Sequence, residues 1–462
     1  MRNLKSLLLK VVAGVFALLL LVVVTVVLVN RKDEPVSQAA LKLRHIAESS
    51  EQVADGDNAY VYLLGYSARE NADVRPESFA RVKWFRDFFA RSGPSELSEY
   101  PGKDHVPSEA SDPELKHLAA LCKDDNRACA DALERDPARI RTWVQRDAEL
   151  IGRYEGLIEF TRWRELWPSD VRAPIPRFSQ VAEGQRLMLL RAWLMAGQGD
   201  VKGCKRLLEQ DLKFWRMTLG ESSSLISKMI AAGAIERHFT MGNLVLRRLP
   251  PASVMAAIPE NWREPMSFHE TSMAKVMANE WKFSDQLIGP VAASNELQSM
   301  VWEFDSDILA SGFLGRFLFQ PQATSNANAE RMLAVMTLFE RDQKEMQSAA
   351  KEMLSTEAFA QKGITELGIY NFTGALLLNL TEPDTFVKYG FRVANLEAIR
   401  RVAFLASQLR SARIESNKVA GELQKSGIRD PFDGRPFAWE STQANLVLHR
   451  TQGGNADLKI AY

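Results

Sequence analysis

Cysteine, glycine, proline and net charge are all scarce in this chain. Its 462 residues are enough to bury a core without disulfide staples, and only three are cysteines. With 26 glycines and 19 prolines, the chain has too few turn-forming residues for a collagenous, disordered or many-turned all-β protein. Lysine and arginine number 58, as do aspartate and glutamate, so the formal net charge is zero. We therefore expect no nucleic-acid partner, because binding phosphates requires a basic surface and only a local patch could supply one.

One long hydrophobic run lies near the N-terminus. Residues 11–29 are nineteen consecutive residues without a charge. A helix of that length crosses ~28 Å of hydrocarbon at ~1.5 Å per residue. A cleaved signal peptide would have a shorter apolar region followed by small residues, whereas charged and polar residues follow this run at 30–34. We expect a retained anchor that contacts the lipid bilayer through residues 6–30, with a cleaved signal as the alternative.

Basic residues on either side of the run predict its orientation. Arg2, Lys5 and Lys10 precede it. Arg31 and Lys32 follow it. This small bias favours an N-terminus in the cytoplasm, and no later segment is as long without charges. The expected location is the bacterial inner membrane, crossed once, with the body of the protein in the periplasm.

The three cysteines are interpreted in that oxidising compartment. Cys122 and Cys129 flank the polar residues 123–128. In one continuous helix the pair would lie ~10 Å apart, beyond the reach of a disulfide, but a turn between two helices brings them together. We expect a disulfide here, with two free thiols as the alternative, and only His117 lies nearby to support a zinc site. Cys204 shares a helical face with apolar residues, which predicts a buried, inert thiol.

The segments after the anchor mostly carry apolar residues at helical spacing and begin with recognisable N-caps. We expect a mainly α protein in which an N-terminal transmembrane helix precedes an irregular multi-helix periplasmic body with a small C-terminal β-hairpin. Residues 92–113 are rich in serine, proline, glycine and charge, which indicates a long surface loop. Predicted helices cover residues 76–91, 137–158, 181–196, 201–219, 222–249, 327–354 and 396–423.

These elements divide the chain into four predicted segments. They are a cytoplasmic tip with the transmembrane anchor (1–35), a helical region with the cysteine-tied hairpin (36–175), a helical bundle (176–428) and a C-terminal hairpin cap (429–462). Within the bundle, residues 181–219 resemble one unit of a tetratricopeptide-like repeat. No second copy follows at a fixed period, and a solenoid needs about three stacked units, so an irregular bundle is expected.

The last predicted long helix carries five arginines beside its apolar face. They are Arg392, Arg400, Arg401, Arg410 and Arg413. We interpret them as a solvated face, with a lipid or nucleic-acid site as the alternative.

The C-terminal segment changes character. Residues 430–437 (DPFDGRPF) predict a turn, and residues 438–440 and 446–449 predict the strands of a hairpin. Phe432, Phe437 and Trp439 would leave a large apolar area in water if this segment hung free, so we expect it to pack on the helical body as a cap.

Several segments together resemble a group of uncharacterised proteobacterial envelope proteins. They are NAYVYLLGY (58–66), the Cys-x6-Cys hairpin, FQPQAT (319–324) and DPFDGRPFAW (430–439). The last is also similar to the tail of the pseudopilins of type II secretion, but this chain lacks their short cleavable leader. No assembly function is carried over. The resemblance implies an inner-membrane-anchored envelope protein of unknown role.

Known catalytic motifs are absent from the sequence. It contains neither a Gly-x-Ser-x-Gly nucleophile elbow nor a His-Glu-x-x-His zinc signature, since His269 and Glu270 are followed by Thr271. Residues 199–205 lack the spacing of a phosphate-binding loop and are interpreted as a turn between helices. The acidic pair in residues 305–307 has the form seen in metal-dependent glycosyltransferases, but it lies in a predicted helix, and a capping or solvated turn is the alternative.

Two clusters of side chains are candidate binding sites. Copper could bind to a helical face that carries soft ligands, with ordinary core packing as the alternative. The residues of that face are His269, Met273, Val276, Met277 and Glu280. A second set could line a groove for a partner or touch the bilayer, with a core position as the alternative. It comprises Phe313, Phe317 and Phe319.

Two classes of function remain open. The first is a membrane-tethered periplasmic scaffold or adaptor that binds another envelope protein, without an identified small-molecule substrate or cofactor. The second is a periplasmic membrane-anchored enzyme of hydrolase or glycosyltransferase type, using His269, Glu270 or the acids of residues 305–307. A concave polar pocket with clustered acids would favour the enzyme, whereas an open groove lined by aromatic side chains would favour the adaptor.

Overall fold

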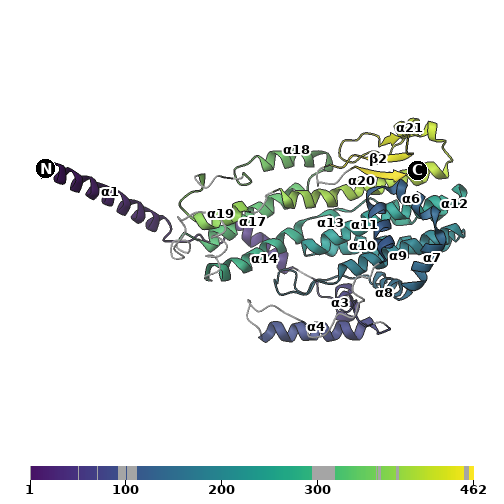
Figure 1. Cartoon of the computed structure of the whole chain (residues 1–462), viewed down its shortest axis with the longest axis horizontal. Helices are drawn as coiled ribbons and strands as arrows, with labels where there is room; N and C mark the ends of the chain where they lie inside the picture. Colours follow the sequence, from purple (N-terminus) through teal and green to yellow (C-terminus); the bar gives the residue numbers. More distant parts are fainter. Residues whose placement is uncertain are drawn as a thin grey trace.

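A computed structural model describes residues 2–49, 51–69, 71–91, 100, 112–293, 318–360, 362, 366–380, 384–451 and 457–462. The fold is mainly α-helical, as expected, with a small antiparallel sheet near the C-terminus. One helix projects from an elongated body, and the sheet lies at the opposite end of that body (Figure 1). The predicted loop at residues 92–113 lies almost wholly outside the described residues.

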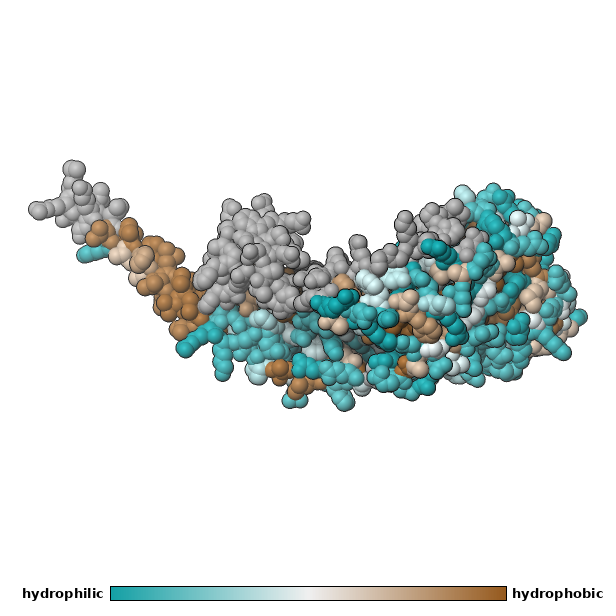
Figure 2. Space-filling model, turned by 90° about the horizontal axis from the view of Figure 1, so that it is seen from below, coloured by the Kyte–Doolittle hydropathy of each residue, from teal (hydrophilic) through white to brown (hydrophobic). Residues whose placement is uncertain are grey.

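The projecting helix is α1 (Arg2–Val29). Its segment Leu9–Val29 is long and apolar enough to cross a membrane, and none of it is buried against the body. Figure 2 shows this apolar helix as a hydrophobic rod, whereas the visible face of the body is mostly hydrophilic. The position and length of the predicted N-terminal apolar helix are therefore confirmed.

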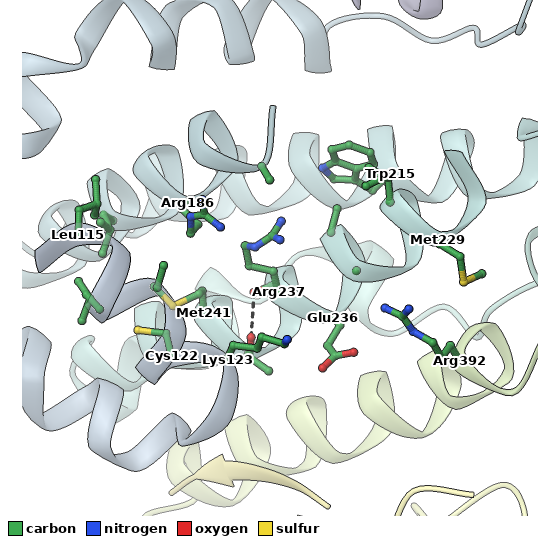
Figure 3. Close-up of a pocket in the computed structure, with 18 residues that line it drawn as sticks. Leu115, Cys122, Lys123, Arg186, Trp215, Met229, Glu236, Arg237, Met241 and Arg392 are labelled. Atoms are coloured by element: carbon green, nitrogen blue, oxygen red, sulfur yellow. Dashed lines mark hydrogen bonds between the residues drawn. The ribbon is translucent and has the colours of Figure 1, made fainter. Parts of the chain in front are cut away.

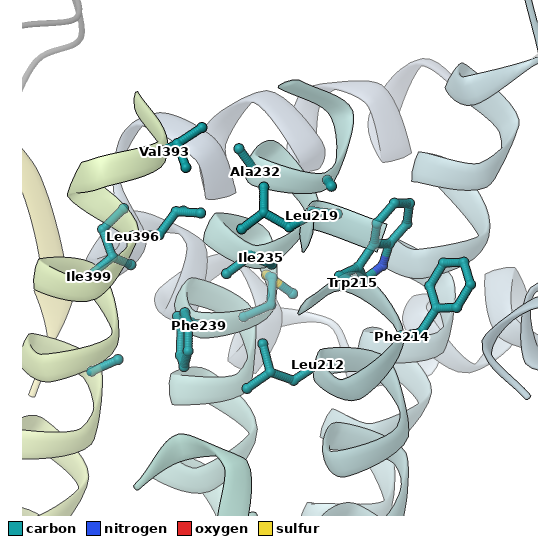
Figure 4. Close-up of a cluster of buried hydrophobic side chains, with 14 of the residues drawn as sticks. Leu212, Phe214, Trp215, Leu219, Ala232, Ile235, Phe239, Val393, Leu396 and Ile399 are labelled. Atoms are coloured by element: carbon teal, nitrogen blue, oxygen red, sulfur yellow. The ribbon is translucent and has the colours of Figure 1, made fainter. Parts of the chain in front are cut away.

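Four helices form the centre of the body. They are α9 (Phe178–Gly197), α10 (Val201–Glu221), α11 (Leu225–Arg248) and α20 (Thr385–Ser411). Asp200 accepts a hydrogen bond from the amide of Gly203 (2.9 Å) and so caps α10, as its position in the sequence indicates. Large apolar side chains such as Trp215, Phe239 and Leu396 fill the space between these helices (Figure 4). Burying each of them stabilises the fold by roughly 1.5–3 kcal/mol.

The remaining helices surround this centre. The first group comprises α2 (Gln38–Glu48), α14 (Ala274–Ala293), α17 (Pro321–Leu338), α18 (Gln343–Leu354) and α19 (Phe372–Leu380). The second group comprises η1 (Asp55–Asp57), α3 (Ala59–Leu64), α4 (Val74–Arg91), α5 (Pro113–Asp124), α6 (Asn126–Arg135), α7 (Pro137–Arg146) and α8 (Ala148–Ile158). The short elements are α12 (Pro251–Ala257), η2 (Glu260–Trp262) and α13 (Phe268–Thr271), and α21 (Ser416–Lys425) follows α20.

Three predicted long helices are each interrupted. Residues 137–158 form α7 and α8, which meet at Asp147. The predicted helix 327–354 is divided between α17 and α18, whose N-cap Asp342 accepts from the amide of Lys344. The predicted helix 396–423 is divided between α20 and α21, with Arg413 at a φ of 55°. The helices on both sides of each break turn an apolar side to the core, so the helical spacing of apolar residues continues across the break. That spacing alone therefore does not predict the break.

The arginine face of α20 is not wholly solvated, which corrects the expectation. Arg400 is buried, pairs with Glu397 (2.7 Å) and donates to the carbonyl oxygen of Trp262 (2.7 Å). Arg410 donates to the carbonyl oxygen of Asn243 (3.2 Å). Burial, together with nearby Arg247, lowers the pKa of Arg410 to about 9. These arginines satisfy buried backbone oxygens of neighbouring elements, which a helical-face pattern cannot reveal.

The C-terminal cap is a sheet of three strands, one more than expected. Strands β1 (Ala438–Glu440) and β2 (Asn445–Leu448) form the predicted hairpin, and β3 (Leu458–Ala461) pairs with β2. Phe432 and Phe437 are buried, which confirms that the segment packs on the body. Asn126 of α6 accepts from the amide of Ala461 (2.9 Å), so the third strand is held by a helix far away in the sequence.

The turn before β1 should be intolerant of a branched side chain. Gly434 has a φ of +71°, although a Cβ there would meet no neighbouring atom. Gly434→Val should therefore destabilise the protein by about 1–2 kcal/mol through backbone strain alone. Gly434→Asn is the matched control, since asparagine tolerates this conformation and should retain most of the stability. Equal melting temperatures for the valine and asparagine variants would contradict this account.

Candidate functional site

A pocket of about 430 Å³ lies among α5, α9, α10, α11 and α20 (Figure 3). Its volume falls within the range of roughly 300–1,000 Å³ that is usual for ligand sites. Its apolar wall comprises Leu115, Leu118, Leu190, Trp215, Met229, Ile230 and Met241. Its charged side chains are Lys123, Arg186, Arg237, Arg392 and a single acid, Glu236. The pocket is therefore neither a cluster of acids nor an open aromatic groove.

Positive charge exceeds negative charge in this pocket. Arg186 is paired with Glu183 (Nε to Oε2, 3.1 Å), and Glu236 is paired with Arg450 (2.6 Å). Within the part of the chain that the structure describes, Arg237 and Arg392 have no carboxylate partner within 4.0 Å. An anion is thus the ligand whose charge would complement the pocket.

The predicted disulfide forms one edge of the pocket. Cys122 at the end of α5 and Cys129 on α6 are bonded, with 4.6 Å between their α-carbons. Asp125 lies between the two helices and caps α6 by accepting from the amide of Ala128 (2.9 Å). Cys122 also lines the pocket, so the bond constrains its α5 wall. Cys204 is buried as expected, and burial raises the pKa of its thiol to about 12.

A buried hydrogen-bond network lies behind the pocket. The Asp211 carboxylate on α10 is fully buried and accepts hydrogen bonds from three other helices. Its donors are the hydroxyl of Tyr154 on α8, the amide of Gln185 on α9 (3.1 Å) and Nδ1 of His238 on α11 (2.7 Å). The Gln185 oxygen in turn accepts from Arg237. The network therefore orients a charged side chain that lines the pocket.

The Asp211–His238 pair is not arranged as a catalytic base. The indole N–H of Trp262 donates to Nε2 of His238 (2.7 Å). An indole nitrogen is only a donor, so Nε2 of His238 accepts. Nδ1 therefore carries the imidazole proton and donates a hydrogen bond to Asp211. The nitrogen that would have to accept a proton during catalysis is already occupied, in a side chain with no exposed surface. This pair holds the helices together.

The predicted copper-binding face does not form. The chain turns at Ser272 between α13 and α14, so His269 does not share a helix with the methionines. Met273 and Met277 are buried in the core. His269 is exposed and contacts Glu221 (2.9 Å). In the described residues, no group of three or more His, Cys, Asp or Glu side chains could hold a metal ion.

The other candidate residues have structural partners or lie outside the described part. Glu270 pairs with Arg216 (2.6 Å) and forms a capping box with Ser267. Burial opposes ionisation of Glu270, but the Arg216 and Ser267 contacts lower its pKa below the usual value. Phe319 is buried. The acids of residues 305–307, and Phe313 and Phe317, lie outside the described residues.

The junction between the anchor and the body forms a second site of interest. Asn30 follows α1 and is only 4% exposed. Its side-chain nitrogen donates to the carbonyl oxygen of Ile369 (2.9 Å), and its side-chain oxygen accepts from the backbone amide of Asn371 (3.0 Å). Its own carbonyl oxygen accepts from the side chain of Gln320 (2.8 Å). The end of the apolar helix is thus bonded to two distant segments of the body.

The linker after Asn30 is also bound to the body. Asp33 accepts from the backbone amides of Gln322 (2.8 Å) and Ala323 (3.0 Å) at the start of α17. A carboxylate is favourable there, because the first amides of a helix have no partner within it. Asn326 accepts from the amide of Ser37 (2.9 Å) and donates to the carbonyl oxygen of Pro35 (2.9 Å). The segment 319–324, noted only for a resemblance, therefore docks the anchor.

No protein-family model, curated protein or solved structure matches this chain. The site thus has to be interpreted from its own geometry. The sequence pattern did not indicate Gln185, Arg237 or Gly233, all of which belong to the pocket or support it. The one available signal was a glycine at 233 inside a long helical pattern, which often marks a close approach or an open space.

The buried amine of Lys228 on α11 should make the stability of the protein depend on pH. The amine is buried and donates to the carbonyl oxygens of Leu219 (2.7 Å) and Glu270 (2.8 Å). Burial, with a smaller effect of Lys275, lowers its pKa from 10.5 to about 7. Between these values the unfolded chain binds a proton that the folded chain lacks, so stability should rise with pH by up to about 1.4 kcal/mol per unit.

Lys228→Met should flatten that rise when unfolding is measured by denaturant between pH 7 and pH 10. Lys213→Met is the matched control, because Lys213 is an exposed lysine of the neighbouring helix α10. Its pH profile should follow that of the unmodified protein. A profile for Lys228→Met that still rises in parallel with the unmodified protein would contradict a buried, neutral amine.

Proposed function

We propose that this protein is a membrane-tethered periplasmic scaffold that presents its helical body to another envelope protein in a fixed orientation to the inner membrane. The observation that carries the proposal is the docked end of α1. Asn30 is bonded to Gln320, Ile369 and Asn371, and Asp33 caps α17. A tether that only retained a protein at the membrane would not need these buried contacts.

The state of the candidate catalytic groups supports a scaffold over an enzyme. His238 has both ring nitrogens occupied, and Glu270 is paired with Arg216. Lys228 caps two backbone carbonyl oxygens. Groups that hold helices together in this way are not free to exchange protons with a substrate.

Two exposed apolar side chains offer positions at which a partner could contact the body. Phe268 is 61% exposed and Ile226 is 49% exposed. The Lys228 amine bonds to the carbonyl oxygen of Glu270 (2.8 Å), so the segments that carry these two residues lie side by side. A partner that covers such side chains removes apolar area from water, which favours its binding.

The docked junction predicts a narrow distribution of distances between anchor and body. Spin labels would be placed on cysteines at the exposed positions Thr25 and Glu330 of the full chain in nanodiscs. The double variant Asn30→Ala, Asn371→Ala removes the side-chain bonds of both residues at the junction and should broaden the distribution. Asn379→Ala is the matched control, since the Asn379 side chain bonds to the backbone of Lys362 and not to the anchor or its linker. A distribution already broad without any substitution would refute the fixed orientation.

The function itself is tested in intact cells. A photoreactive amino acid at Phe268 or Ile226 should crosslink to one envelope protein, whereas the exposed position Lys418 serves as the control. Loss of that crosslink in the Asn30→Ala, Asn371→Ala variant would support presentation by the anchor. A reporter fused after Tyr462 should be active only outside the cytoplasm. Crosslinks that occur equally from Lys418, or a reporter active inside the cell, would reject the proposal.

A further inference from the structure

Arg237 is a cationic side chain of the pocket that a buried neighbour holds in place. Among the described residues it bonds through its side chain only to the side-chain oxygen of Gln185. Gln185 cannot rotate freely, because its amide donates to Asp211 (3.1 Å) and to the carbonyl oxygen of Ala234 (3.0 Å). The guanidinium is thus held in place by a buried network, while its other N–H donors are left for a ligand.

Two guanidinium groups face the same space. Arg186 and Arg237 both line the pocket, and Figure 3 shows their side chains near each other. Burial is the main cause, and the charge of Arg186 the second, of a decrease in the pKa of Arg237 to about 10. Arg237 is still protonated at neutral pH. Glu183 pairs with Arg186, whereas among the described residues Arg237 has no carboxylate within 4.0 Å. An anion beside both groups would balance the charge of Arg237, and planar guanidinium groups match carboxylate and phosphate oxygens.

The rest of the pocket suits a hydrocarbon chain. Leu118, Leu190, Met229 and Ile230 contribute apolar side chains to its wall. Gly233 also lines the pocket, and a Cβ there would meet no atom within 4 Å. A small inorganic anion would leave this apolar space unused.

We propose that the pocket binds a single-chain anionic amphiphile, an acyl chain with a carboxylate or phosphate head group. The head group lies between Arg186 and Arg237, and the chain lies along the apolar side chains of α5 and α11. The disulfide between Cys122 and Cys129 keeps α5 in place as a wall of this site. The proposal is independent of the scaffold function, since it does not require a partner protein.

The test uses the full chain in phosphatidylcholine nanodiscs with a diazirine derivative of palmitate. Photolabelling followed by mass spectrometry should place the label on α5 and α11, in addition to α1 within the bilayer. Excess palmitate or hexadecyl phosphate should remove the label from α5 and α11, and the better competitor identifies the head group. Methyl palmitate, which is neutral, and inorganic phosphate, which has no chain, should compete at least about tenfold less well.

Two variants test the pocket directly. Arg237→Gln removes the charge and should reduce labelling of α5 and α11 about tenfold. Gly233→Leu fills the open space and should reduce it to a similar extent, without weakening the helix, because leucine is a better helix former than glycine. Arg141→Gln is the control, since Arg141 is exposed on α7. Labelling of α1 should be unchanged in all three.

Several results would overturn the proposal. Equal competition by inorganic phosphate would indicate an anion site that does not use a chain. Equal competition by methyl palmitate, or undiminished labelling of Arg237→Gln, would show that the head group is not recognised. Undiminished labelling of Gly233→Leu would place the label outside the pocket. A normal melting temperature of Gly233→Leu ensures that its loss of labelling reports a filled pocket and not an unfolded protein.

Discussion

The burial of one carboxylate, that of Asp211, constrains the centre of this molecule. A buried carboxylate is costly unless its oxygens are hydrogen-bonded, and here α8, α9 and α11 each supply a donor to α10. The constraint extends outward in two directions. His238 links the network to Trp262 and so to η2, whereas Gln185 links it to Arg237 in the pocket. The same interactions therefore set the relative positions of the helices and the direction of a cationic side chain.

Buried polar groups are also hydrogen-bonded at the end of the molecule that faces the anchor. Helix α17 begins at Pro321 after a glutamine that forms no side-chain cap, and the missing acceptor is supplied by Asp33 from the linker. The buried side chain of Asn30 bonds to the backbone of Ile369 and Asn371, and the buried side chain of Asn371 bonds to Gln320 and Thr324. Polar groups that would be costly if left alone thus become a specific attachment, because each finds its partner only when anchor and body meet.

The pocket and the junction are separate features of one helical body. The junction joins α1 to the end of the body formed by α17 and α19, and the pocket lies among α5, α9 and α11. Each depends on polar contacts between segments that are distant in the sequence. The proposed partner contact and the proposed ligand site use different side chains, so the two proposals can be tested separately.

The sequence by itself determined the features that depend on neighbouring residues. The apolar length of α1, the N-caps at Asp200 and Ser224, the Cys122–Cys129 turn and the positive φ of Gly434 all follow from local chemistry. Tertiary structure alone decided the rest. Arg400 is buried and Arg410 half-buried because oxygens on other elements accept from them, and β3 exists because β2 and Asn126 offer it partners. Likewise Arg237 is held at the pocket because Gln185 on another helix accepts from it. A residue's own pattern carries no record of which distant group will satisfy it, since that depends on how the helices pack.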